Sequence, residues 1–203
     1  EVTPEVAWKR ATDAGLTSQD LTDIKQLVQQ SINNGDMTTM QAKDAVVADL
    51  QNVGFTSQEA SRIANAATAD VVEGTVAQKL IELNVPSDQL DILSGAITDQ
   101  VMSGQDLKTS VNAVGQELQK TTGMDSTESL LAANKILTGM DVTNEVNNTL
   151  SKYNYAATPE QVNQMILDNV GENRSGLTTN VVQTKVSDIL KNSGLSEDAV
   201  TKI

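Results

Sequence analysis

Cysteine and histidine are both absent from the 203 residues of this sequence. Without cysteine the chain has no disulfide bond, no thiolate nucleophile and no sulfur ligand for a metal. Without histidine it lacks the base of Ser-His-Asp and Cys-His catalysis and the imidazole ligands of zinc and haem sites. An enzyme built from this sequence would therefore have to rely on carboxylate, lysine, tyrosine or serine chemistry.

Aromatic side chains are almost as scarce, since the chain has one Trp, one Phe and two Tyr. Leu, Val, Ile, Met and Ala must therefore supply nearly all of the buried surface, and an apolar content of 38% is enough for a folded core. Small aliphatic side chains favour closely packed helices over a thick β-sandwich.

Positive charge is scarce as well, because 14 Lys and Arg stand against 27 Asp and Glu, for a formal net charge of -13. Such a chain repels phosphate backbones and anionic lipid surfaces, so we expect no direct binding of nucleic acid. No apolar run approaches the ~20 residues that span a bilayer, so we expect a soluble chain without a membrane span. The compartment is not defined by the sequence, although the composition would suit a virion or an extracellular protein.

Apolar residues recur at spacings of three and four between regularly spaced glycines, and this is the helical period. One segment carries Leu21, Ile24, Leu27, Val28 and Ile32, and no strand pattern competes with this period. The expected helices cover residues 4–13, 18–33, 38–52, 57–73, 75–84, 87–103, 106–121, 126–138, 142–153, 158–170, 178–192 and 197–203. The sequence therefore predicts an all-α protein.

Hydroxyl and carboxylate side chains stand where most of these helices begin, and they can accept hydrogen bonds from the unpaired first-turn amides. The expected caps are Thr17 or Ser18, Thr38 or Asp36, Thr56 or Ser57, Ser87, Asp125 or Ser126, Thr158 and Ser196. The three prolines, Pro4, Pro86 and Pro159, also stand at helix starts, where a missing amide proton costs nothing.

The chain resembles itself at an offset of 69 residues, which aligns Gly35 with Gly104 and Gly54 with Gly123. A third partial copy follows at an offset of about 140. We therefore predict tandem four-helix repeats of about 70 residues, built from helical hairpins, in a solenoid or an elongated bundle. The predicted units are a terminal helix at 1–14, repeat one at 15–83, repeat two at 84–155 and an incomplete repeat three at 156–203.

Sites for metals, phosphates and catalysis find little support in the sequence. A calcium loop of the EF-hand type that starts at Asp36 would place Met40, Gln41 and Val47 at key positions, and these side chains do not fit it. No glycine-rich phosphate loop occurs, and the carboxylates fall on polar helix faces rather than in an apolar cleft. We therefore predict no cofactor and no enzymatic activity, with a carboxylate-based hydrolase as the alternative that paired Asp or Glu in a pocket would support.

The few aromatic residues divide into two groups. Phe55 follows Gly54 at a helix junction and is predicted to hold successive helices together. Trp8, Tyr153 and Tyr155 are the candidate partner contacts, because Trp and Tyr contribute disproportionately to binding energy. The alternative is that these three side chains cover the edges of the core.

The stretch from Ile24 to Val71 contains a helix, a glycine, a capped helix, a second glycine and a helix with an A..IA pattern. This order resembles the helical pattern of bacteriophage minor head and internal virion proteins, and it covers less than a quarter of the chain. The minor head pattern has Arg-Thr-Glu where this sequence has Asn65, Ala66 and Ala67, so no functional residue is carried over. The resemblance implies a role in particle assembly.

These features predict a structural or assembly protein that is not an enzyme and that associates with itself or with an assembly partner as an oligomer. The predicted array starts and stops within a repeat, so we expect either a piece of a longer protein or a subunit whose ends a neighbour completes. The alternative function is an acidic helical binding module that grips a basic or helical protein partner.

Overall fold

The computed structural model describes residues 9, 11–34, 37–138, 158–170, 188 and 191. Within these ranges every regular element is a helix and no strand occurs. The main helices are α2 (Ser18–Asn34), α3 (Thr39–Asn52), α4 (Ser57–Glu82), α5 (Ser87–Met102), α6 (Leu107–Thr122), α7 (Ser126–Thr138) and α9 (Pro159–Val170). The predicted all-α class is confirmed for the described part of the chain.

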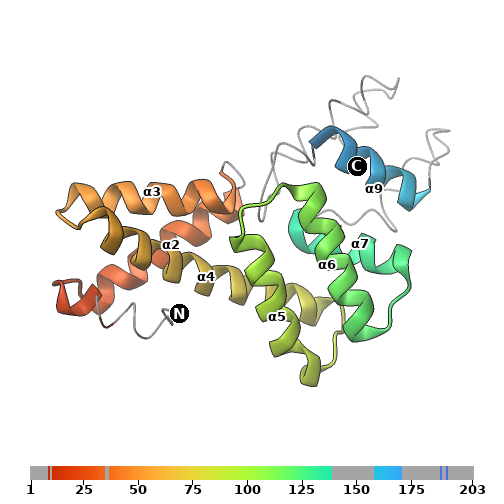
Figure 1. Cartoon of the computed structure of the whole chain (residues 1–203), viewed down its shortest axis with the longest axis horizontal. Helices are drawn as coiled ribbons and strands as arrows, with labels where there is room; N and C mark the ends of the chain where they lie inside the picture. The colour runs from red at the N-terminus through yellow and green to blue at the C-terminus, as the bar shows by residue number, and fades with distance from the viewer. Residues whose placement is uncertain are drawn as a thin grey trace.

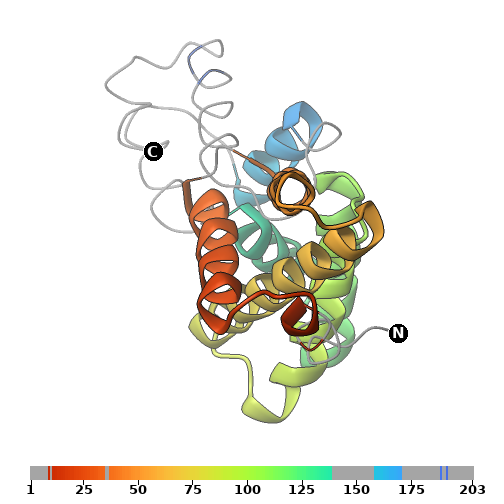
Figure 2. The ribbon, with the colours of Figure 1, turned by 90° about the vertical axis from the view of Figure 1, so that its left-hand side faces the viewer.

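The long helix α4 connects two groups of helices (Figure 1). At one end α2 and α3 pack against α4 and against each other, and Figure 2 shows this end with α3 viewed nearly along its axis. At the other end α4 packs on α5, α5 packs on α6, and α6 and α7 form an extensively packed hairpin. Helix α9 lies against both α6 and α7.

One hydrophobic core runs through both groups of helices, from Val28 of α2 to Leu167 of α9. Its largest fully buried side chains are all aliphatic: Leu80, Leu93, Ile97, Leu107, Leu118, Ile136, Leu137 and Val28. This composition agrees with the expectation that a chain poor in aromatic residues packs its helices closely. Phe55 and Met124, which occupy matching turns, are partly buried against this core.

Local capping accounts for most helix starts. Thr56 accepts a hydrogen bond from the Glu59 amide at 3.2 Å, and the Glu59 carboxylate accepts one from the Thr56 amide at 3.0 Å. The same reciprocal pair joins Thr17 to Asp20, Thr38 to Gln41 and Thr158 to Gln161. The prediction that Ser87 caps α5 is wrong: Pro86 is the capping residue, it makes no side-chain bond, and its carbonyl instead accepts from the Gln89 amide at 2.9 Å.

The Glu59 cap makes the stability of the protein depend on pH. Hydrogen bonds from the backbone and then the side chain of Thr56 hold the pKa of Glu59 below its ordinary value of 4.5. A carboxylate with a lowered pKa in the folded state contributes stability above the unfolded pKa and loses it as the pH falls through the folded pKa. We expect the difference in unfolding free energy between the wild type and Glu59→Gln, from urea titrations, to stay nearly constant from pH 7 down to about 4.5 and to shrink as the pH falls further through the lowered pKa of the folded state. A difference that stays constant below pH 4.5 as well would contradict the assignment.

Gly74 does not end a helix, and the prediction of separate helices at 57–73 and 75–84 is wrong. The helix α4 passes through Gly74 without a left-handed residue. Val72 and Val76 on either side are fully buried, so their packing holds the helix together across a residue that favours a break.

Left-handed backbone conformations recur at the predicted offset. Gly54 and Gly123 have φ values of 106° and 74°, and Gly15 and Asn84, also 69 residues apart, have φ values of 100° and 59°. Asn84 is the only described residue other than glycine with a positive φ. The turn before α5 therefore has the backbone conformation of the turn before α2, although its residue type differs.

Asn84 provides a direct test of this turn. An alanine in the left-handed region costs about 1 kcal/mol because its Cβ meets the backbone, whereas glycine has no Cβ. We expect Asn84→Ala to lower the free energy of unfolding by about 1 kcal/mol and Asn84→Gly to leave it within about 0.5 kcal/mol, both measured by urea denaturation. Equal stability of the two variants would show that the turn relaxes out of this conformation.

Buried positions also recur between the two groups of helices. The buried residues Ala60, Ile63, Ala64, Ala67 and Thr68 of α4 match the buried Ser129, Ala132, Ala133, Ile136 and Leu137 of α7 at the offset of 69. The α3–α4 and α6–α7 hairpins thus bury corresponding faces. The predicted boundary between residues 83 and 84 falls in the turn between α4 and α5, while the tandem solenoid stays a prediction.

Candidate functional site

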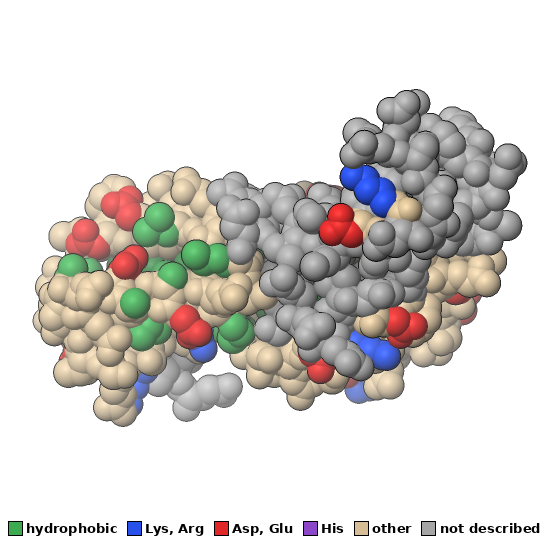
Figure 3. Space-filling view, turned by 90° about the horizontal axis from the view of Figure 1, so that it is seen from above, with side chains coloured by type: hydrophobic (Ala, Val, Ile, Leu, Met, Phe, Trp, Pro, Cys, Tyr) green, Lys and Arg blue, Asp and Glu red, His purple; other side chains and the backbone are tan. Residues whose placement is uncertain are grey.

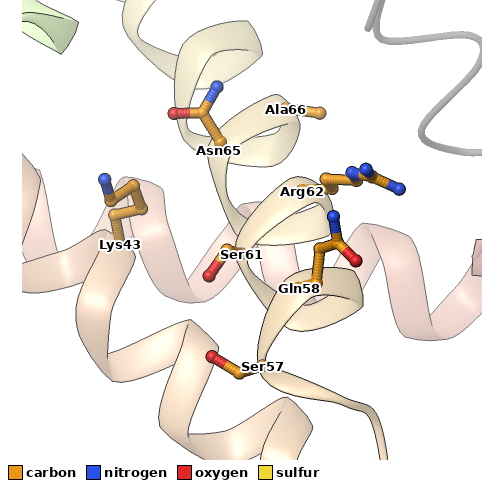
Figure 4. A pocket seen from close by; sticks show the side chains of 7 residues that line it. All are labelled: Lys43, Ser57, Gln58, Ser61, Arg62, Asn65 and Ala66. Carbon is orange, nitrogen blue, oxygen red and sulfur yellow. The ribbon is translucent and has the colours of Figure 1, made fainter.

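A groove of about 740 Å³ lies between α3 and the first half of α4. Its lining residues are Lys43 from α3 and Ser57, Gln58, Ser61, Arg62, Asn65 and Ala66 from α4 (Figure 4). The α4 residues form three adjacent pairs spaced by four, and this spacing places them along one face of the helix. Ala66 is buried and Lys43 half-buried, whereas the other five side chains are exposed.

The groove contains two cations and no carboxylate among its lining residues. Lys43 and Arg62 form no ion pair within the part of the chain that the structure describes, although Lys25 pairs with Asp70 and Lys108 with Asp168. Arg62 also helps, after the hydrogen bonds from Thr56, to hold the pKa of Glu59 low. The residues that line the groove therefore carry a net positive charge.

The chemistry of these side chains suits the binding of anionic groups. Ammonium, guanidinium, hydroxyl and amide groups donate hydrogen bonds to carboxylates, and such bonds are stronger when both partners are charged. We therefore describe the groove as a candidate site for an anionic protein surface.

Lys79 is a half-buried lysine of α4. Its Nζ donates a hydrogen bond to the backbone carbonyl of Ile136 at 2.7 Å, and burial lowers its pKa. Ile136 lies in the last turn of α7, where carbonyl groups have no partner within the helix and a nearby cation is favourable. Lys79 thus links α4 to the end of α7, a structural role.

The candidate partner contacts Trp8, Tyr153 and Tyr155 all lie outside the described residues, so they stay predictions. Among the described residues no group of three or more Asp or Glu side chains is placed to hold a metal ion. No described helix is long and apolar enough to cross a membrane.

Sequence reasoning missed Lys43 and Arg62 because they belong to different predicted helices. Only the packing of α3 on α4 brings them to one groove. One feature of the sequence could have indicated the α4 side of the groove. Polar residues without Asp or Glu recur there at a spacing of four, which is unusual in a chain with a net charge of -13.

The fold and the groove define an all-helical protein over its described residues, with a cationic groove on an acidic chain. No protein-family model matches the sequence, and comparisons with curated proteins and with solved structures found no significant match. The resemblance of residues 24–71 to phage minor head and internal virion proteins therefore stays a prediction.

Proposed function

We propose that this chain is a structural or assembly protein without enzymatic activity, built from related helical units that associate with further copies of themselves. Each unit of such a protein buries only part of its apolar surface internally and completes the burial against a neighbour.

The observation that carries the proposal is the recurrence of one helical arrangement in both halves. Corresponding turns are left-handed and corresponding hairpin faces are buried in α3–α4 and α6–α7. Each hairpin is also contacted by a further helix, since α9 lies on α6–α7 and α5, which matches α9 at the offset of 69, contacts α3 and α4. The open groove that borders α3–α4 is suited to receiving another subunit.

Exposed aliphatic side chains add to this support. Val53 is 72% exposed, Ile92 67%, Ile81 53% and Leu27 52%. Figure 3 shows hydrophobic side chains gathered, with scattered carboxylates, on the end of the molecule that contains α3. Such surfaces mark contact sites when they border polar groups that fix orientation.

Sedimentation velocity over a wide range of protein concentration tests the proposal. We expect the average mass to rise with concentration, and electron microscopy of the concentrated sample to show multimers of regular spacing. A monomer of constant mass throughout would contradict self-association, and a monomer that nevertheless binds a basic protein would favour the binding-module alternative.

A further inference from the structure

The α6–α7 hairpin shows how a helix is held on this type of surface. Helix α9 contacts both α6 and α7, and its Val162 and Leu167 are only 2% and 3% exposed. At the rim of this contact, Lys108 Nζ of α6 lies 3.3 Å from Asp168 Oδ1 of α9. An apolar centre and a lysine–aspartate pair thus hold one helix against the hairpin.

The groove beside the α3–α4 hairpin has an exposed lining, although α5, which matches α9 at the offset of 69, contacts both α3 and α4. At the offset of 69, Ser61, Arg62 and Asn65 of α4 match Leu130, Leu131 and Asn134 of α7. The three α7 residues are partly or fully buried, whereas the three α4 residues are exposed and line the groove (Figure 4). The lining of this groove is more polar and more cationic than the matching α7 residues, so its occupant must bring negative charge.

Helix α5 carries a stripe of negatively charged side chains on its outer face. Asp88, Asp91, Ile92 and Asp99 are exposed at spacings of three, one and seven, so they lie on one side of the helix. Ile92 protrudes between the carboxylates with 67% of its surface exposed. These three aspartate side chains make no ion pair or hydrogen bond within the described residues, since the ion pairs found there use Asp70 and Asp168.

Gly95 lies on the same side of α5, between Ile92 and Asp99. A Cβ atom added there would meet no other heavy atom within 4 Å, so the position is open towards solvent. The absence of a side chain allows another helix to approach the α5 backbone closely, as small residues do at other helix contacts.

We propose that the outer face of α5 in a second copy of this chain docks into the α3–α4 groove, with Asp88 and Asp91 facing Lys43 and Arg62. The inference rests on the proposed function and specifies the contact through which the copies associate. Groove and stripe are different surfaces of one molecule, so each copy offers one of each to its neighbours. A contact of this head-to-tail kind extends into a ring or a filament instead of stopping at a symmetric dimer.

Charge reversal of each surface tests the contact in the full chain. The groove variant is Lys43→Glu with Arg62→Glu, the stripe variant is Asp88→Lys with Asp91→Lys, and Lys120→Glu and Glu73→Lys are controls at exposed sites elsewhere. Like charges across an interface cost several kcal/mol, so we expect each double variant to weaken self-association by on the order of a hundredfold or more. The controls should stay within about threefold of the wild type, because exposed charges contribute little on their own.

Mixing the two double variants provides the decisive measurement. The mixture pairs an intact groove with an intact stripe, and a reversed groove with a reversed stripe, so multimers should return in the equimolar sample. Raising the salt from about 0.05 M to about 0.5 M should weaken the wild-type association, because screening reduces the attraction between opposite charges.

The outcomes separate the two proposals. A wild type that stays monomeric overturns the proposed function and this contact together. A wild type that self-associates while the groove variant, with unchanged helicity by circular dichroism, associates equally well overturns only the contact. If both double variants lose self-association and their equimolar mixture does not recover it, the pairing of groove with stripe is also overturned.

Discussion

Gly74→Pro is expected to lower the free energy of unfolding by about 3 kcal/mol or more, because Gly74 lies inside the continuous helix α4. Proline removes the amide that bonds to the carbonyl four residues earlier, and its ring collides with that carbonyl. The affected carbonyl belongs to Asp70, whose side chain pairs with Lys25 of α2, so the distortion would also disturb the packing of α2 on α4.

Gly74→Ala is the matched control and is expected to act in the opposite direction. A Cβ at this position meets no other atom within 4 Å, and alanine favours the helix over glycine by about 0.5 to 1 kcal/mol. Urea denaturation of the two variants beside the wild type measures both effects. If residues 57–73 and 75–84 were separate helices, proline in the turn between them would be tolerated, so a stable Gly74→Pro variant would contradict a continuous α4.

Leu80→Ala is expected to cost about 2 to 5 kcal/mol of unfolding free energy. Leu80 has no exposed surface and belongs to the core that joins α4 to α5, α6 and α7. Truncation removes buried methyl groups and leaves a cavity that close-packed neighbours fill only in part.

Ile81→Ala serves as the neighbouring control, because Ile81 is 53% exposed on the same turn of α4. We expect this change to cost less than about 1 kcal/mol, since part of the side chain remains in water in both states. Thermal and urea unfolding of the two variants give the comparison. Equal losses at positions 80 and 81 would mean that α4 is rotated about its axis relative to the structure described above.

Features that depend on neighbours in the sequence were predicted well. The pairing of Thr56 with Glu59 and the left-handed turn at Gly54 are set by residues within a few positions of one another. Their geometry follows from the unpaired amides at a helix start and from the absence of a Cβ in glycine. The wrong prediction of a break at Gly74 has a different origin. Glycine disfavours a helix, but the burial of Val72 and Val76 on either side outweighs this preference.

The groove was beyond the reach of the same reasoning. Lys43 and Arg62 belong to different helices, and the sequence around each one predicts only an ordinary exposed cation. Their shared surface depends on the angle and register at which α3 crosses α4, which side-chain packing along the whole contact determines.

The helical class, most of the helix starts and the aliphatic nature of the core can be predicted from the order of the residues alone. These properties follow from periodicity, capping and composition, which act over one or two helical turns. Three further properties depend on tertiary packing: α4 is one helix, α9 lies on α6 and α7, and an open cationic groove borders α3 and α4. These properties depend on contacts between residues far apart in the chain, where burial outweighs the preference of any single residue.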